Sequence, residues 1–270
     1  MNKCTQTKDR LRQEAAAVRF NHWTLALAGA GLVSMASLAH AEEAPQQVLT
    51  ALSSTTLSGY VNTSAIWKFG TGKTVVGRAF DGTSKQDGFN LDVVKLSVEK
   101  PLDEGQWAAG YKVDLLFGPD AIGYNAPLAS LGAPPDFSFK QAYVALRAPV
   151  GNGLDFKIGT WDTCIGYEGF DAPANPNYSR SYGYTLEPLA HTGVMASYQL
   201  CEAASVSVGV ANTWVTGVNL RSPGAESSKT YMALLTLTAP ESFGFLKGAT
   251  LNAGVVDGFA GNLVDTTSYY

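Results

Sequence analysis

Apolar and polar residues alternate along most of this 270-residue chain, and the alternation limits the fold more than any other feature of the sequence. In the run 107–117 every second residue is apolar or aromatic, and the residues between them include Lys112 and Asp114. Successive side chains of a β-strand point to opposite faces of a sheet, so such a run predicts a strand with one apolar and one polar face. The sequence therefore predicts an all-β fold.

Nine such runs, and the beginning of a tenth at residue 265, follow one another along the chain. The nine cover residues 56–67, 90–100, 107–117, 137–148, 154–159, 192–200, 205–214, 229–239 and 249–259. Most are near the roughly 9 to 11 residues that a tilted strand needs to cross a bilayer, and longer than the roughly 5 or 6 common in soluble sheets. Short turns alternate with long polar loops between them, which is typical of outer-membrane barrels.

These features predict an antiparallel, up-and-down transmembrane β-barrel, and a secreted β-sandwich is the alternative. No apolar stretch after residue 41 approaches the length of a membrane helix, and a membrane protein without such helices must be a closed barrel. Bacterial barrels have an even number of strands and close by pairing the last strand with the first. Nine strands and the start of a tenth therefore suggest a chain truncated from a larger barrel.

The N-terminus has the order of a secretory signal, with five basic residues before an apolar run from Trp23 to Leu38 that ends in Ala39-His40-Ala41. That run has 16 residues, short of the roughly 20 that a membrane helix needs, so a retained anchor helix is the weaker alternative. We expect cleavage before Glu42. The predicted segments are a signal peptide over 1–41, a short linker over 42–55 and the barrel, incomplete at its C-terminus, over 56–270.

Charge and composition after residue 41 argue against several classes of function. This part of the chain has 14 Lys and Arg against 21 Asp and Glu, a net charge of −7, which does not indicate nucleic-acid binding. It retains two cysteines, Cys164 and Cys201, and one histidine, His191, so we expect no metal site and no cofactor. The two cysteines could pair in an oxidising periplasm, but unpaired cysteines are the commoner outcome.

Catalysis would have to depend on His191. A serine triad would use this histidine, which follows Glu187 by four residues, but the chain contains no Gly-x-Ser-x-Gly motif. A lone histidine near a strand end is more often a loop or rim residue. We therefore expect no catalytic residues and no enzymatic activity.

Seven charged residues lie on the predicted polar faces, opposite the apolar stripes. They are Lys95, Glu99, Lys112, Asp114, Arg147, Asp155 and Lys157. In a barrel that side is the lumen, where charges of both signs set the ion preference of a pore. The alternative is that they are hydrated wall residues, paired across strands for about 0.2 to 1 kcal/mol each.

The longest predicted loop, 164–188, is rich in aromatic and charged residues. Loops of this length inside a compact domain usually have a function. One interpretation is that it folds inward and narrows the pore, and the residues placed near the passage are then Glu168, Asp171, Tyr178 and Arg180. An external surface loop is the other interpretation, and the sequence does not choose between them.

Several segments together resemble the OmpL-like β-barrel porin family. They are residues 90–96, 100–105, 107–120, 140–159, 175–184 and 191–194, within a resemblance that covers about residues 55–270. Members are predicted outer-membrane porins with longer chains, so the resemblance implies a barrel in the outer membrane of a Gram-negative bacterium. It supplies no catalytic residue.

We therefore expect passive diffusion of small hydrophilic solutes or ions through a water-filled barrel. The alternative is a non-conducting barrel with a structural or surface-binding role. The expected partners are the lipid bilayer and small hydrophilic solutes, without nucleic acid, and assembly into a homo-oligomer stays open.

Overall fold

The computed structural model describes residues 54–70, 79–124, 136–221, 228–259 and 264–270. The expected signal peptide and nearly all of the expected linker lie outside the described residues, so both stay predictions. The described residues belong to one unit, Ser54–Tyr270.

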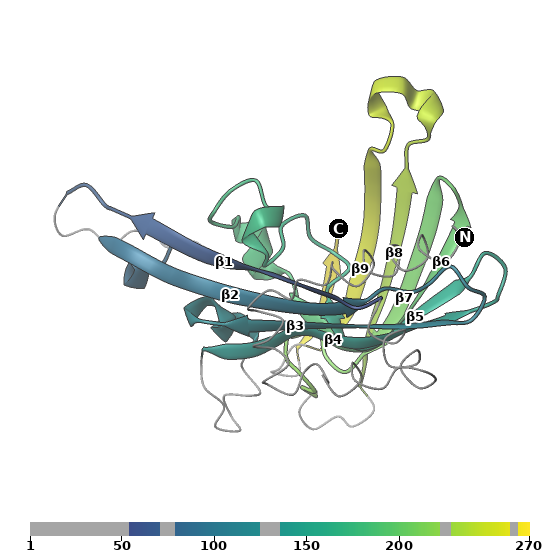
Figure 1. Cartoon of the computed structure of the whole chain (residues 1–270), viewed down its shortest axis with the longest axis horizontal. Coiled ribbons are helices and arrows are strands. Elements are labelled where there is room, and N and C mark those ends of the chain that lie inside the picture. Colours follow the sequence, from purple (N-terminus) through teal and green to yellow (C-terminus); the bar gives the residue numbers. More distant parts are fainter. Residues whose placement is uncertain (1–53, 71–78, 125–135, 222–227, 260–263) are drawn as a thin grey trace, which may run out of the picture. The chain divides into compact units, whose positions relative to one another are not determined.

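Ten β-strands form a single sheet in this unit (Figure 1). The strands are β1 (Thr56–Ile66), β2 (Gly88–Lys100), β3 (Ala108–Phe117), β4 (Phe137–Ala148), β5 (Leu154–Asp162), β6 (Ala190–Cys201), β7 (Ala204–Ala211), β8 (Thr230–Thr238), β9 (Thr250–Phe259) and β10 (Asp265–Tyr269). Each strand pairs antiparallel with the next one in the chain, so the order in the sheet is the order in the sequence. The predicted all-β, up-and-down fold is confirmed, and the run that begins at residue 265 is a tenth strand.

The sheet is open within the described residues, because its edge strands β1 and β10 do not pair with each other. Closure into a barrel, and the number of strands that would complete it, therefore stay predictions.

The seventh strand is shorter than predicted and ends at Ala211 instead of Trp214. Beyond Ala211 the chain still contacts β6, because the backbone N–H of Asn212 donates to the carbonyl of Thr192 and the carbonyl of Thr213 accepts from Nδ1 of His191 at 3.3 Å, but the regular pairing ends. The polar residues Asn212 and Thr213, which follow Ala211, interrupt the apolar stripe at this point.

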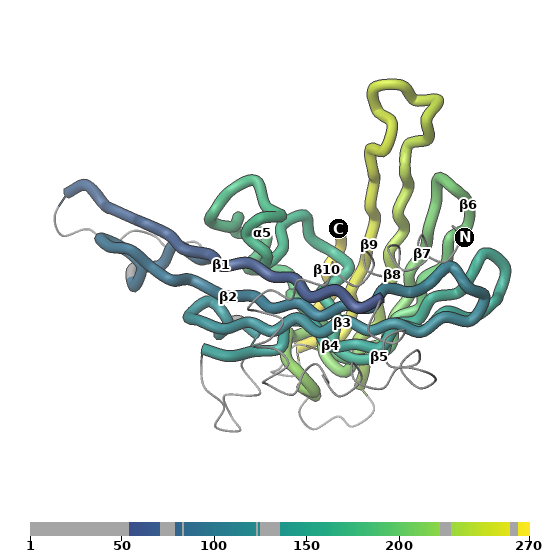
Figure 2. Tube along the Cα trace, in the orientation of Figure 1, coloured from purple at the N-terminus to yellow at the C-terminus, as the bar shows by residue number. Residues whose placement is uncertain are grey.

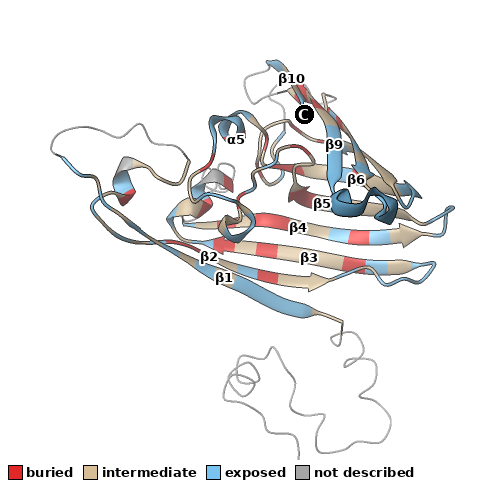
Figure 3. Ribbon diagram, turned by 90° about the horizontal axis from the view of Figure 1, so that it is seen from above, coloured by how far each residue is buried: buried red, intermediate tan, exposed pale blue. Residues whose placement is uncertain are grey.

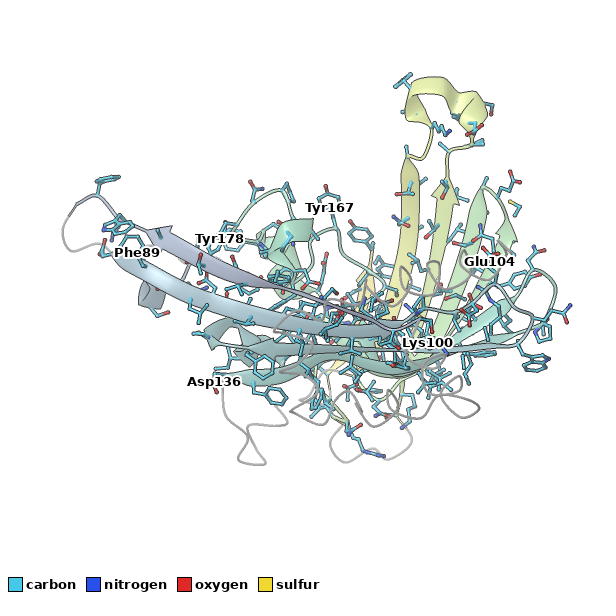
Figure 4. The ribbon with its side chains drawn as sticks, viewed as in Figure 1. Phe89, Lys100, Glu104, Asp136, Tyr167 and Tyr178 are labelled. Carbon is cyan, nitrogen blue, oxygen red and sulfur yellow. The ribbon has the colours of Figure 1, made fainter. Side chains whose placement is uncertain are left out.

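The two ends of the sheet differ in the length of their connections. Short turns join β2 to β3, β4 to β5 and β6 to β7. At the opposite end the connections from β1 to β2, β3 to β4, β5 to β6 and β7 to β8 are longer, and only the one from β9 to β10, residues 260–264, is short. Figure 4 places Phe89 and Asp136 at the long-connection end of β2 and β4, and Lys100 and Glu104 at the short-turn end. The hairpin between β8 and β9 lies at the short-turn end but is longer, because its tip forms the 3-10 helix η5 (Glu241–Leu246).

Helical structure is brief. The remaining helices are η2 (Thr83–Lys85), η3 (Pro119–Tyr124), η4 (Ala172–Ala174) and α5 (Tyr182–Leu186). No helix within the described ranges is long and apolar enough to cross a membrane.

One face of the sheet is apolar and exposed along nine strands. Each of β1 to β9 contributes at least one large apolar side chain that is more than a third exposed: Leu57, Val61, Leu91, Leu96, Phe117, Val144, Leu146, Ile158, Val194, Val208, Val210, Leu235, Leu237 and Leu251. Soluble monomers rarely expose an apolar surface of this extent, whereas the lipid-facing side of a membrane barrel requires it. We call this face the outer face.

Aromatic residues gather on the outer face at the long-connection end. The rings of Trp67 and Phe89 meet edge to face with centroids 5.0 Å apart, and Phe137 lies 5.3 Å from both Phe117 and Phe139. At the other end of β3, Trp107 is 77% exposed. Aromatic residues at both limits of an apolar band are the arrangement of the interfacial girdles of outer-membrane barrels.

The opposite face, which we call the inner face, contains the buried residues of the sheet. Figure 3 shows buried positions recurring along β3 and β4, whereas β1 is largely exposed. Two apolar clusters lie on this face. The first consists of Val93, Leu116, Ala121, Tyr124, Phe170 and Ala190, and the second of Trp161, Ile165, Met195, Ala211, Met232 and Val256. Since Phe170 and Ile165 come from the loop 163–189, the loop packs against the inner face.

Candidate functional site: the charged inner face and its covering loop

Two β-bulges turn charged residues toward the inner face. In the β1–β2 ladder Asn62 pairs with Val93 and Thr63 with Leu91, so Asp92 is the extra residue. Similarly, Lys140 is the extra residue of β4 opposite β3. By strict alternation each would share the outer face with the apolar residues that follow it, but a bulge lets two successive residues face the same side. Asp92 and Lys140 are buried on the inner side as a result.

Six of the seven charged residues predicted from alternation form three ion pairs across neighbouring strands. Lys95 lies 3.1 Å from Asp114, and Lys112 lies 3.0 Å from Glu99. The guanidinium of Arg147 donates two hydrogen bonds to Asp155, at 2.6 and 2.7 Å, which is the bidentate geometry that arginine favours with carboxylates. The charges of these six residues therefore compensate one another locally.

The seventh residue, Lys157, forms no ion pair with the described residues. It lies opposite Ala145 in the β4–β5 register, and its ammonium stands 5.1 Å from the centroid of the Tyr143 ring. This is the distance of a cation–π contact, which leaves the net positive charge in place. Lys157 is thus the one predicted pore-lining residue that has an aromatic ring, and no carboxylate at ion-pair distance, as its partner in the part of the chain that the structure describes.

The loop 163–189, which we call the covering loop, is bound to the inner face through Asp171. Its carboxylate accepts hydrogen bonds from the Tyr60 hydroxyl on β1 and the Lys95 ammonium on β2, both at 2.9 Å, and lies 3.2 Å from Lys140 on β4. Lys140 also contacts Asp162 at the end of β5. Figure 2 shows the α5 segment of this loop on one side of the sheet that β1 to β5 form. One loop carboxylate therefore links three strands.

Electrostatics favours the ionised form of Asp171. Burial by itself raises the pKa of its carboxyl, but the charges of Lys140 and Lys95 and their hydrogen bonds outweigh burial, so the pKa lies below its ordinary value. The loop is consequently held by a carboxylate that stays charged at neutral and mildly acidic pH.

A second group of contacts centres on Lys85 in η2. Its ammonium lies 2.8 Å from Asp92 and 2.7 Å from Asp120 of η3, and it donates to the hydroxyl of Tyr178 at 3.1 Å. Burial lowers the pKa of this ammonium, but its hydrogen bonds to the two carboxylates and to Tyr178 reverse that effect and raise the pKa. Lys85 thereby joins three long connections at the same end of the sheet.

Arg180 organises the interior of the covering loop. The side chain is 1% exposed and donates to the carbonyls of Gly169, Asn177, Tyr178 and Phe170 at 2.5 to 3.0 Å. Its guanidinium carbon stands 4.9 Å from the centroid of Phe80. Since its donors are used on backbone carbonyls, Arg180 holds the loop in one shape. Of the other predicted loop residues, Glu168 accepts from the backbone N–H of Ser181 at 2.8 Å.

The ring of His191 is held by a threonine hydroxyl and a backbone carbonyl. It is 1% exposed, its Nε2 lies 3.1 Å from the hydroxyl of Thr163, and its Nδ1 bonds the carbonyl of Thr213. No serine hydroxyl or carboxylate contacts this ring in the part of the chain that the structure describes. Cys164 and Cys201 are free thiols. No group of three or more His, Cys, Asp or Glu in the described ranges could hold a metal ion.

Sequence reasoning missed Tyr60, Lys85, Asp92, Asp120, Lys140 and Asp162 as members of this site. A signal for two of them was present. Asp92 is in phase with Val94 and Leu96, and Lys140 with Ala142 and Val144, so each places a charge on an otherwise apolar stripe. A charged side chain that faces lipid lowers the stability of a barrel, so a charge within an apolar stripe indicates a bulge that turns it to the other face.

An up-and-down sheet with an exposed apolar face, aromatic rims and a charged opposite face is the architecture of a porin-like β-barrel. The family model described as "Putative beta-barrel porin-2, OmpL-like" matches residues 54–259. The chain belongs to this family, which indicates an outer-membrane barrel. Searches of curated proteins and of solved structures each gave no match.

Proposed function

We propose that the protein is a porin that lets small hydrophilic solutes or ions diffuse passively through a water-filled barrel in the outer membrane. The observation that supports it is the difference between the two faces of the sheet. The outer face is apolar and exposed, whereas the inner face has ion pairs within reach of water, with Lys112 and Glu99 23% and 38% exposed. A barrel with charged, hydrated walls is suited to conduct small polar solutes.

The covering loop would act in this pore as a constriction. It packs over the inner face of β1, β2 and β4 through Asp171, while Arg147, Asp155 and Lys157 lie closer to the short-turn end and form no hydrogen bond or ion pair with the described residues of the loop. The loop would then narrow the lumen near the middle of the strands, and the charged residues nearer the short-turn end would line a wider part of the passage.

Export would use the N-terminal signal, with cleavage before Glu42, and no enzymatic step is part of the proposal. The environment of His191, with two threonines as its hydrogen-bond partners, supports the latter. N-terminal sequencing of the protein recovered from outer membranes would test the cleavage site directly.

Conductance across planar bilayers tests the proposal. Purified, folded protein should give stepwise, ohmic currents in potassium chloride. Folding is monitored independently by the shift in gel mobility on heating and by the β signal in far-ultraviolet circular dichroism. Silence from a folded barrel would contradict the porin function and support the second candidate, a non-conducting structural or surface-binding barrel. The dense contacts of the covering loop on the inner face are the observation that favours this second candidate.

A further inference from the structure

A cavity of about 260 Å³ lies between the covering loop and the sheet. Its walls come from Asp162 at the end of β5, from Lys140 on β4, from Tyr124 of η3 and from residues of the loop 163–189. Liquid water occupies roughly 30 Å³ per molecule, so the space suits several waters or one small solute.

The charges around this cavity are predominantly negative. Asp162, Glu168, Asp171 and Glu187 line it, against the single ammonium of Lys140. Lys140 forms ion pairs with both Asp162 and Asp171, so these two carboxylates already balance its positive charge. The cavity thus has an excess of carboxylate, which favours a cation.

Two carboxylates have capacity for a ligand. Oδ1 of Asp162 is buried and has no hydrogen-bond partner among the described residues. Glu187 forms no ion pair with the described residues, and burial together with the nearby charge of Glu168 raises the pKa of its carboxyl. A bound cation would give Oδ1 of Asp162, whose other oxygen meets Lys140, its missing partner, and would place a positive charge beside Glu187.

The hydroxyl of Tyr184 is an independent indication of a ligand. The side chain is 6% exposed, lines the cavity, and its hydroxyl has no partner within the described part of the chain. Buried tyrosine hydroxyls usually find a hydrogen-bond partner. A ligand in the cavity would supply that partner.

Aromatic rings complete the walls. Tyr124, Tyr167, Phe170 and Tyr184 all line the space, and the rings of Tyr124 and Phe170 meet edge to face 5.1 Å apart. Figure 4 shows Tyr167 on the covering loop. Aromatic faces attract ammonium groups and also accommodate a short hydrocarbon chain.

We propose that this cavity is a binding site for a small organic cation, an alkylammonium whose charged end meets Asp162 and Glu187 and whose chain lies against the aromatic walls. A metal ion fits less well, because the described carboxylates do not form a group that could hold one. The site goes beyond the proposed porin function, because equilibrium binding does not require that the barrel conducts.

Calorimetric titration of the purified, folded protein in detergent with n-butylammonium chloride tests the site. Butanol and sodium butyrate, which have chains of the same length but no charge or a negative one, are the matched probes. The cation should bind saturably, and the other two should not. The absence of saturable butylammonium binding, or equal binding of butyrate, would overturn the proposal.

Variants locate the binding. Glu187→Gln should weaken butylammonium binding about fivefold, as expected for the loss of one partly buried charge contact, and Tyr184→Phe should weaken it measurably by removing only the hydroxyl. Glu241→Gln makes the same charge change on η5, far from the cavity lining, and should bind like the unaltered protein. Glu187 and Tyr184 lie outside the strands, and each variant is used only if its heat-dependent gel mobility is unchanged. Full affinity in both folded variants would overturn the assignment to this cavity.

Discussion

Strands β2–β5 and β6–β9 present the same apolar outer face but differ on the inner face. β2–β5 contain eleven charged residues, and all of them except Lys100 lie on or contact the inner face. β6–β9 contain one, Asp257, which pairs with Tyr231 on the outer face. The inner face of β6–β9 instead has small and apolar residues such as Gly209, Met195 and Met232, and neutral polar pairs such as Ser197 and Ser207, whose hydroxyl oxygens are 2.8 Å apart.

This difference separates two requirements on the sequence. The outer face must be apolar in both halves if both contact lipid, whereas the inner face is free to vary with what it contacts. The charges of β2–β5 lie where the covering loop docks and where the proposed passage runs. The predictions below test this division, beginning with the largest expected effect.

Lysine substitution at two adjacent residues of β7 tests whether the outer face contacts lipid and the inner face does not. Val208 is 52% exposed on the outer face, and Ser207 faces inward. Val208→Lys should lower the free energy of unfolding by about 2 to 4 kcal/mol, as a lysine facing the middle of the bilayer does. Ser207→Lys should cost about 1 kcal/mol, from the lost hydrogen bond. Urea titration in lipid vesicles measures both, and equal effects would contradict a lipid-facing outer face.

Removing Lys140 tests how strongly the charged half depends on its ion pairs. Lys140→Ala leaves Asp162 and Asp171 without their shared cation, and should cost about 2 to 3 kcal/mol, less than for a fully buried pair because the Asp162 side chain is 38% exposed. The same urea titration measures it.

Lys247→Ala is the control for Lys140→Ala. Lys247 pairs with Glu241 at an exposed hairpin tip, where the two side chains are 60% and 83% exposed. Its removal should change the free energy of unfolding by less than about 0.5 kcal/mol. Equal losses in the two variants would show that the bulge ion pairs do not hold the charged half together.

Acid should release the covering loop. The pKa of Asp171 is lower in the folded protein than its ordinary value of about 4, so its ionised form stabilises the loop above that pH. This contribution is lost as the pH falls below about 4 through the folded pKa, because the protonated carboxyl no longer attracts the Lys95 and Lys140 that face it. Limited proteolysis by pepsin between pH 4 and pH 2 should show progressively faster cleavage within residues 163–189.

Asp171→Asn provides the comparison for the acid experiment. This variant lacks the titrating carboxyl, so its loop should be cleaved readily already at pH 4. Its cleavage rate should then rise less on further acidification. Tyr60 also faces Asp171 but stays neutral in this range, and Asp162, which shares Lys140 with Asp171, is present in both proteins. Identical pH profiles would exclude Asp171 as the residue that holds the loop.

The sequence was sufficient to predict the order of the strands and which of their stripes is apolar. The period of two is a local property, so the limits of β4 were predicted to the residue, and the apolar stripe of β3 lies on the outer face as expected. The three ion pairs among Lys95, Asp114 and the four other paired residues follow from the same local rule once neighbouring strands are in register.

The bulges and the docking of the loop depend on distant residues. A bulge is a mismatch between two strands, so Asp92 is understood only together with its pairing partner Asn62. Similarly, Asp171 finds its partners on three strands that are separated from it by tens of residues in the sequence. The sequence showed that the loop was long and charged, but tertiary contacts determine which face it covers.

The smallest predicted effect concerns ion preference within the charged half. Lys157 faces inward without an ion-pair partner among the described residues, whereas Arg147 is paired with Asp155. If the inner face lines a conducting pore, Lys157→Ala should raise the cation-to-anion permeability ratio by about twofold, the effect of one hydrated and screened charge near the passage. The double variant Arg147→Ala and Asp155→Ala removes one charge of each sign and should leave the ratio nearly unchanged. Reversal potentials in a potassium chloride gradient measure both, and a larger shift in the double variant would mean that paired charges, not the uncompensated one, set the field in the lumen.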